Sequence, residues 1–197
     1  LGVGDREVDV FTVAALFTTV TNVNFEPDRI QMLIAKASEM RNKARALYER
    51  ACAKVGKTPE QLGGPAAWEP ASDLEGLLRQ GEEVSIPKRK EELGEDLTGL
   101  AYLIIYGLKG VAAYADHAQI LGQEDDAVYA AFHEILDFLT KENPTADELV
   151  TKALKVGELN LRVMELLDAA NTGAYGHPVP TAVRITPVRS KAILVSG

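Results

Sequence analysis

The 197-residue chain has little cysteine, few aromatic residues and no excess of positive charge. Its single cysteine, Cys52, excludes a disulfide within the chain and is typical of a reducing compartment, so we predict a cytoplasmic location. The formal net charge of −8 argues against a surface for nucleic acid or an anionic membrane. No uninterrupted apolar stretch reaches the ~18 residues of a membrane span. We therefore expect neither nucleic-acid nor membrane partners.

The residues that are abundant favour an all-α fold. Hydrophobic residues make up 46% of the chain and charged residues 25%, as in ordinary globular proteins. Apolar residues at helical spacing predict a first helix over about Val8 to Val20. Pro27 suits the first turn of a second helix, which ends near Gly56. The second helix has a heptad seam: Ile30, Leu33, Ala37, Met40, Ala44, Leu47 and Ala51.

The next segment, residues 57–94, is predicted to connect two helical units. "GGPAAWEP" has the composition of a loop. Ser72 and Glu75 form a capping-box pattern for a short helix that stops at Gly81. The polar sequence "SIPKRKEEL" then leads into the second unit.

Three helices are predicted after residue 94. They cover residues 95–122, residues 124–140 and a last segment from a Thr145–Glu148 capping box to 171–173. Gly107 and Gly110 weaken the first of them by about 1 kcal/mol each relative to alanine, so we expect a neighbouring helix to approach closely at both. The last helix has an apolar stripe in which Asn160 would fix the register: Leu149, Ala153, Val156, Asn160, Val163 and Leu167.

An internal repeat relates the two units. "LGVGDREVDVFTVAALF" from Leu1 resembles "LGQEDDAVYAAFHEILD" from Leu121, and, with one deletion, "TNVNFEPDRI" aligns with "TKENPTADEL". In the second copy "LG" ends a long helix, whereas in the first copy it opens the sequence. We therefore predict two three-helix-bundle units, the first lacking its opening helix.

The last residues, "SKAILVSG", read as a buried strand over Ala192 to Val195 that has no partner strand in the chain. We interpret this orphan strand as the start of an α/β domain outside the sequence. The predicted organisation is residues 1–56 as a first, incomplete helical unit, 57–94 as a connecting segment with a short helix, 95–173 as a second three-helix bundle, and 174–197 as a linker and first strand of the missing domain.

Four phrases resemble the hybrid-cluster (prismane, hydroxylamine reductase) proteins, which are similar in fold to nickel carbon monoxide dehydrogenases. They are "ALFTTVTNVNF", "YGLKGVAAYADHAQILG", "LLDAANTGAYGHPVPT" and "KAILVSG". The resemblance implies that this chain is the first, helical domain (domain 1) of an oxidoreductase. That enzyme would reduce hydroxylamine and protect the cell from nitrosative stress. The resemblance also implies an iron–sulfur cluster and a hybrid iron–sulfur–oxygen cluster in the parent protein. The ligand positions of that family fall outside this chain.

No catalytic, cofactor-binding or metal-ligating residue is therefore predicted in residues 1–197. Cys52 lacks the further cysteines that an iron–sulfur cluster needs. His133 and Asp137 have metal-capable spacing, but a third ligand is not evident, and a surface pair is the alternative. His117 is read as a surface or capping residue.

Trp68 and residues 175–180 each have one structural and one functional interpretation. Trp68 is interpreted as a plug over the joint between the units, with ligand stacking as the alternative. Residues 175–180 are interpreted as a rigid turn near a cofactor domain, or as a plain linker.

The main functional hypothesis is a helical domain of an iron–sulfur oxidoreductase that is inactive alone. The alternative is a stand-alone helical module for protein interaction. The partners predicted are the remainder of the same polypeptide and, for the isolated chain, another copy bound through an apolar groove beside the first two helices.

Overall fold

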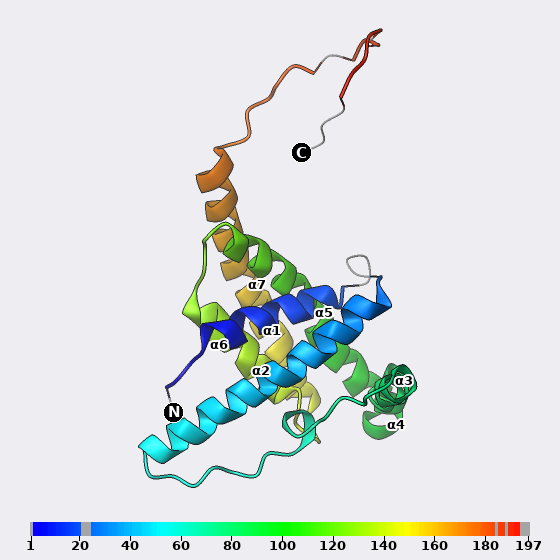
Figure 1. The fold of residues 1–197 in the computed structure, drawn as a ribbon, viewed down its shortest axis with the longest axis vertical. Helices are drawn as coiled ribbons and strands as arrows, with labels where there is room; N and C mark the ends of the chain where they lie inside the picture. The colour runs from blue at the N-terminus through cyan, green and yellow to red at the C-terminus, as the bar shows by residue number, and fades with distance from the viewer. Residues whose placement is uncertain (1, 21–24, 184, 188, 194–197) are drawn as a thin grey trace.

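The structure is a computed structural model that describes residues 2–20, 25–183, 185–187 and 189–193. These residues form helices and irregular segments without a strand, which confirms the all-α prediction (Figure 1). The helices are α1 Arg6–Thr18, α2 Pro27–Lys54, the 3-10 helix η1 Gly64–Ala66, α3 Leu74–Glu83, α4 Ile86–Leu93, α5 Glu95–Ile120, α6 Asp126–Phe138 and α7 Ala146–Tyr175. Of the predicted strand, Ala192 and Ile193 are irregular and exposed, and Leu194 and Val195 lie outside the described residues.

The core forms where α5 and α7 pack along their lengths. A Cβ atom on Gly107 in α5 would lie 2.8 Å from Val156 Cγ1 in α7, so the predicted close approach is confirmed at this glycine. At Gly110 the prediction is wrong, because a Cβ there would meet nothing within 4 Å. The buried core residues of the two helices are Ala101, Ile104, Leu108, Val111, Ala112, Ala115 and Ala118 in α5, and Leu149, Val156, Leu159, Val163, Leu166 and Ala170 in α7.

Helix α1 packs on α5 and also contacts α6 (Figure 1). Val13 is 3% exposed and belongs to the same core as the buried residues of α5, α6 and α7. The Phe17 ring meets His117 of α5 edge-on at 5.4 Å between centroids. The division of the chain at residues 57–94 stays a prediction, and α1 contributes to a core shared with helices beyond that segment.

Helix α2 has 28 residues but little buried surface. It packs against α1, and only Met40, Ala51 and Cys52 on it are buried. Ile30, at the start of the predicted seam, is 43% exposed. Most of the apolar seam of α2 is therefore only partly covered by the described residues.

The internal repeat is visible in the backbone. Helices α1 and α6 both have 13 residues, and their N-caps, Asp5 and Asp125, both accept hydrogen bonds from first-turn amides. Three residues before each cap, Gly2 (φ 63°) and Gly122 (φ 80°) have the left-handed conformation. Adding 120 to an α1 residue number gives its α6 counterpart, and adding 119 to an α2 residue number gives its α7 counterpart.

The connecting segment is more helical than predicted. Helix α3 is capped by Asp73, which accepts from Gly76 N at 2.7 Å, and not by Ser72. It continues through Gly81 because that glycine lacks the positive φ that would end a helix. The polar sequence after it forms α4, whose N-cap is Ser85.

The predicted stripe on α7 is wrong at Asn160, which is exposed, whereas the neighbouring Leu159 is 5% exposed. The helix also continues past the predicted end and stops at Gly176, which has a φ of 77°. The apolar residues of α7 thus follow the face that packs on α5, and the amide has no role in the register.

Among the described residues, α5 is the only helix long and apolar enough to cross a membrane, with a mean hydropathy of 1.3 over an 18-residue window. This differs from the sequence-based expectation, which counted only uninterrupted apolar runs. Helix α5 contacts both α1 and α7, and 33% of that window is buried in the structure.

The Gly107 contact predicts opposite effects for two matched substitutions. Gly107→Leu should lower the free energy of unfolding by about 1–3 kcal/mol, because the new side chain overlaps Val156. Gly110→Leu should raise it by up to about 1 kcal/mol, because the helix gains propensity in open space. Urea unfolding followed by circular dichroism measures both, and equal effects would contradict this packing.

The capping box of α7 predicts a pH dependence. Hydrogen bonds from Lys141 and from the Thr145 backbone lower the pKa of Glu148 to about 2. Because this pKa is lower in the folded than in the unfolded state, the stabilisation is present above about pH 4.5 and is lost as the pH falls toward 2. Glu148→Gln should therefore destabilise the protein at pH 7 and hardly at all near pH 2.

Urea unfolding at several pH values tests this expectation, with Glu142→Gln in the loop before α7 as the control. A Glu148→Gln effect that does not change between pH 7 and pH 2 would contradict it.

Candidate functional site

An apolar groove runs between α1 and α2. We call it the α1–α2 groove, and its volume is about 570 Å³. Its lining residues are Val8, Phe11, Thr12, Ala15, Leu16 and Thr19 of α1, Ala37, Met40, Arg41 and Ala44 of α2, Pro65 and Ala66 of η1, and His133 and Leu136 of α6. The wall on α2 is part of the heptad seam that the sequence predicted.

Arg41 is the cationic residue in this lining, and its side chain is 14% exposed. Its Nη2 donates to Asn42 Oδ1 at 2.9 Å and also pairs with the carboxylate of Glu69. Its Nη1 is buried and has no hydrogen-bond partner among the described residues. A buried N–H group without an acceptor is costly, so this atom is a place where a bound group could add a hydrogen bond.

Near the amino end of α1, Lys43 of α2 holds two carboxylates. Lys43 Nζ donates to Asp5 Oδ1 at 2.8 Å and also pairs with Glu7. These hydrogen bonds lower the pKa of Asp5 and of Glu7 and raise the pKa of Lys43. The three groups tie the N-cap of α1 to α2 and so help to fix one wall of the groove.

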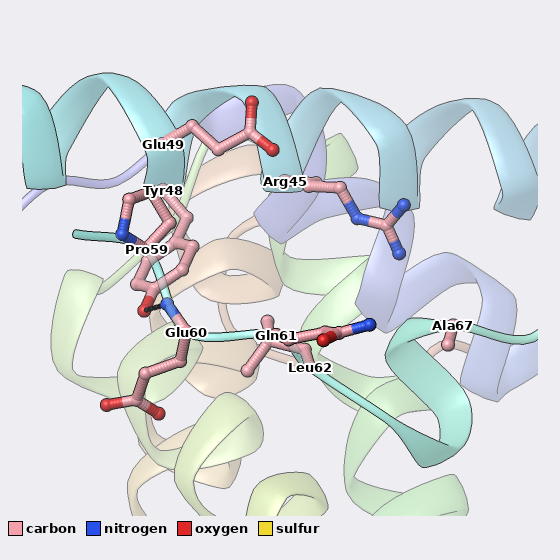
Figure 2. A pocket seen from close by; sticks show the side chains of 8 residues that line it. All are labelled: Arg45, Tyr48, Glu49, Pro59, Glu60, Gln61, Leu62 and Ala67. Atoms are coloured by element: carbon pink, nitrogen blue, oxygen red, sulfur yellow. Dashed lines mark hydrogen bonds between the residues drawn. The ribbon is translucent and has the colours of Figure 1, made fainter.

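Figure 2 shows a smaller pocket, of about 340 Å³, where the chain after α2 runs back beside that helix. The Tyr48 hydroxyl accepts a hydrogen bond from Glu60 N at 3.1 Å, and the Arg45 guanidinium donates to the Ala66 carbonyl oxygen. Because these two side chains serve the backbone of the returning segment, the pocket is explained by how that segment is held on α2.

The structure does not bring the candidate metal residues together. Cys52 is 2% exposed within α2. His133 Nε2 lies 2.9 Å from Asp9 Oδ1 of α1, so its partner is this carboxylate. Asp137, on the same helix, is exposed. The hypothesis of a His133–Asp137 metal pair is therefore not supported by this geometry.

The other candidates lie at the surface. His117 is exposed and contacts Phe17. Trp68 is 40% exposed, which does not suit a plug between units. Residues 175–180, which begin with the last residue of α7, are all exposed to solvent.

No group of three or more His, Cys, Asp or Glu side chains that could hold a metal ion occurs in the part of the chain that the structure describes. The donor set present, with one buried thiol, does not fit an iron–sulfur cluster. No chemical step can be assigned to these residues.

Sequence reasoning missed two features of the groove. It did not single out Arg41, which directly follows the seam residue Met40 in the sequence. It also missed the Asp9–His133 contact, although the repeat held a signal: His133 occupies the position of the apolar Val13 in the other copy.

The family comparison and the comparison with curated proteins both match essentially the whole chain, and both point to the same group of proteins. A sequence model described as the Prismane/CO dehydrogenase family matches residues 2–197. A hydroxylamine reductase of Acidithiobacillus ferrooxidans is 52% identical over 197 residues, which is 100% of this chain and 35% of that protein. Hydroxylamine reductases of Rhodospirillum rubrum and Burkholderia lata are 49% and 46% identical over the same length, and 36% of each is covered.

The chain thus spans about a third of the length of these curated relatives. The family match covers nearly every residue, including all the helices described above. The chain belongs to the Prismane/CO dehydrogenase family.

Proposed function

We propose that this chain is the helical part of an oxidoreductase that reduces hydroxylamine to ammonia and protects from nitrosative stress. The observation that carries the proposal is the 52% identity, over the whole chain, to a protein named hydroxylamine reductase. The reaction adds two electrons and two protons to hydroxylamine and breaks the N–O bond, so that ammonia and water leave. The electrons must come from a redox centre, because no side chain described here has such chemistry.

In this proposal the parent protein carries an iron–sulfur cluster and a hybrid iron–sulfur–oxygen cluster. Residues outside 1–197 hold both clusters, and the chain itself binds no cofactor. This proposal rests on the cysteine count, because an iron–sulfur cluster needs several cysteines and the chain has one, Cys52. We also propose a cytoplasmic location, because a chain with a single cysteine is typical of a reducing compartment.

The helical part then acts as a scaffold that packs against the remainder of the same polypeptide. The exposed apolar side chains support this role, because they need a covering surface. Those beyond α7 include Val179, Val183 and Ile185, which are 77%, 80% and 94% exposed.

The proposal predicts a clear difference between two preparations. The full-length protein, purified without oxygen, should contain iron and reduce hydroxylamine with a chemical electron donor. Residues 1–197 alone should contain no stoichiometric iron and should not reduce hydroxylamine, because an iron–sulfur cluster needs about four ligands. Metal analysis and ammonia release measure both. Iron bound to the isolated chain, or a full-length protein without activity, would contradict the proposal.

The partly covered seam of α2 predicts that isolated residues 1–197 self-associate through the α1–α2 groove. Burial of a leucine-sized side chain contributes roughly 1.5–3 kcal/mol, so a few such contacts suffice. Ala44→Glu, in the groove, should shift the chain to monomer, and Ala35→Glu, on the exposed face of α2, should not. Sedimentation velocity at several concentrations decides this, and a strictly monomeric wild-type chain would refute it.

A further inference from the structure

We propose that each copy of the repeat contains the same ionic clamp, which limits local opening at the start of α1 or of α6. In each clamp a cation on α2 or α7 binds the N-cap carboxylate of the neighbouring helix and one further carboxylate. The two clamps are Lys43 with Asp5 and Glu7, and Arg162 with Asp125 and Glu165. This inference is independent of the proposed function.

The cation and the cap occupy equivalent positions in the two copies. Lys43 of α2 corresponds to Arg162 of α7, 119 positions later, and Asp5 corresponds to Asp125, 120 positions later. Lys43 Nζ donates to Asp5 Oδ1 at 2.8 Å. Arg162 Nε donates to Asp125 Oδ2 at 2.8 Å, and its Nη2 lies 2.8 Å from the same oxygen. The same contact between two helices is therefore present twice.

Both N-cap carboxylates also hold the first turn of their own helix. Asp5 Oδ1 accepts from Glu7 N at 3.1 Å, and Asp125 Oδ1 accepts from Ala127 N at 2.8 Å. The hydrogen bond from Ala127 N and the one from Arg162 lower the pKa of Asp125. Each carboxylate thus joins the start of one helix to the side of another, so loss of the cation should loosen that start.

The two N-cap carboxylates are mostly covered. The side chain of Asp5 is 24% exposed and that of Asp125 is 23% exposed. An ion pair with a largely covered carboxylate is screened less by solvent and salt than a pair on the open surface. The clamps should therefore have a measurable effect on local opening.

The second carboxylate comes from a different helix in each copy. Glu7 lies on α1, but its counterpart on α6 is Ala127. Glu165 lies on α7, where it accepts from Arg162 Nη1 at 3.0 Å, but its counterpart on α2 is Ala46. The acid that each copy lacks on one helix is thus present on the other helix.

The number of carboxylates at each cation is therefore the same, although the position of the second one differs. The two carboxylates leave one negative charge in excess beside the first turn of α1 or α6. The N-terminal end of a helix favours negative charge, because its free N–H groups form the positive end of the helix dipole. The shared feature of the two clamps is this charge arrangement and not a particular side chain.

The first experiment removes single charges from the full-length protein and follows hydrogen exchange at pH 7 by mass spectrometry. Arg162→Met and Glu165→Ala should each accelerate exchange in the first turn of α6 by roughly two- to fivefold, the effect of one ion pair. Glu158→Ala is the matched control, because Glu158 pairs with Lys155 of α7 in the same i, i+3 arrangement. It should leave that turn unchanged, and equal exchange in all these proteins overturns the proposal.

The two clamps should also act locally. Lys43→Met should accelerate exchange at the start of α1 and not of α6, whereas Arg162→Met should do the reverse. In 1 M NaCl, where the Debye length is about 3 Å, both differences from the wild type should fall at least about twofold. Differences that persist unchanged in high salt would show that the two side chains act by packing, and would overturn the proposal.

The decisive experiment moves the second carboxylate of the α6 clamp to the position that it has in the other copy. Ala127 is exposed, so a longer side chain has room there. In the Glu165→Ala protein, Ala127→Glu should return exchange at the start of α6 to within about 1.5-fold of the wild-type rate, because one acid replaces the other at Arg162.

The control for this rescue is Ala127→Glu in an Arg162→Met protein, which measures the benefit of a glutamate near the helix N-terminus without the cation. Slower exchange by the same factor with and without Arg162, or no rescue at all, overturns the proposal. A rescue that requires Arg162 supports it.

Discussion

At Gly107 the backbone of α5 comes so close to α7 that a methyl group would lie 2.8 Å from a Val156 methyl. This contact lets the two longest core helices pack along their lengths, and the other core elements are arranged on the pair. Helix α1 packs on α5, and α6 packs on α7 and α1. The apolar residues of the four helices then form one core with Phe132, Ile104 and Leu108 fully buried.

The repeated helices differ in how far they are covered: α7 contributes six buried residues to the core, whereas only Met40, Ala51 and Cys52 of α2 are buried. Asp5 and Asp125 start equivalent helices after equivalent left-handed glycines. The second copy contains the helix that precedes this turn, and that helix is α5. The α2 seam, which corresponds to the core face of α7, borders a groove instead.

Much of the fold could be predicted because local signals agreed with the packing. Pro27 and Thr145 are first-turn and cap residues, and the structure starts α2 and α7 there. Predictions failed where tertiary contacts decide the outcome. Gly110 looks like Gly107 in sequence, but only Gly107 faces α7. The site was less predictable still: the partner of His133 is Asp9, 124 positions away in sequence, and the unsatisfied nitrogen of Arg41 depends on its surroundings in space.

The central claim is that α5 and α7 are in direct contact at Gly107 and that the other core helices are arranged on this pair. Its most direct test is an experimental structure of the full-length protein, examined at the contact between Gly107 and Val156. The account predicts that the Val156 side chain lies against the backbone of α5 at Gly107, with α1 packed on α5 and α6 packed on α7. A layer of other side chains between α5 and α7 at Gly107, or an α1 that does not touch α5, would contradict it.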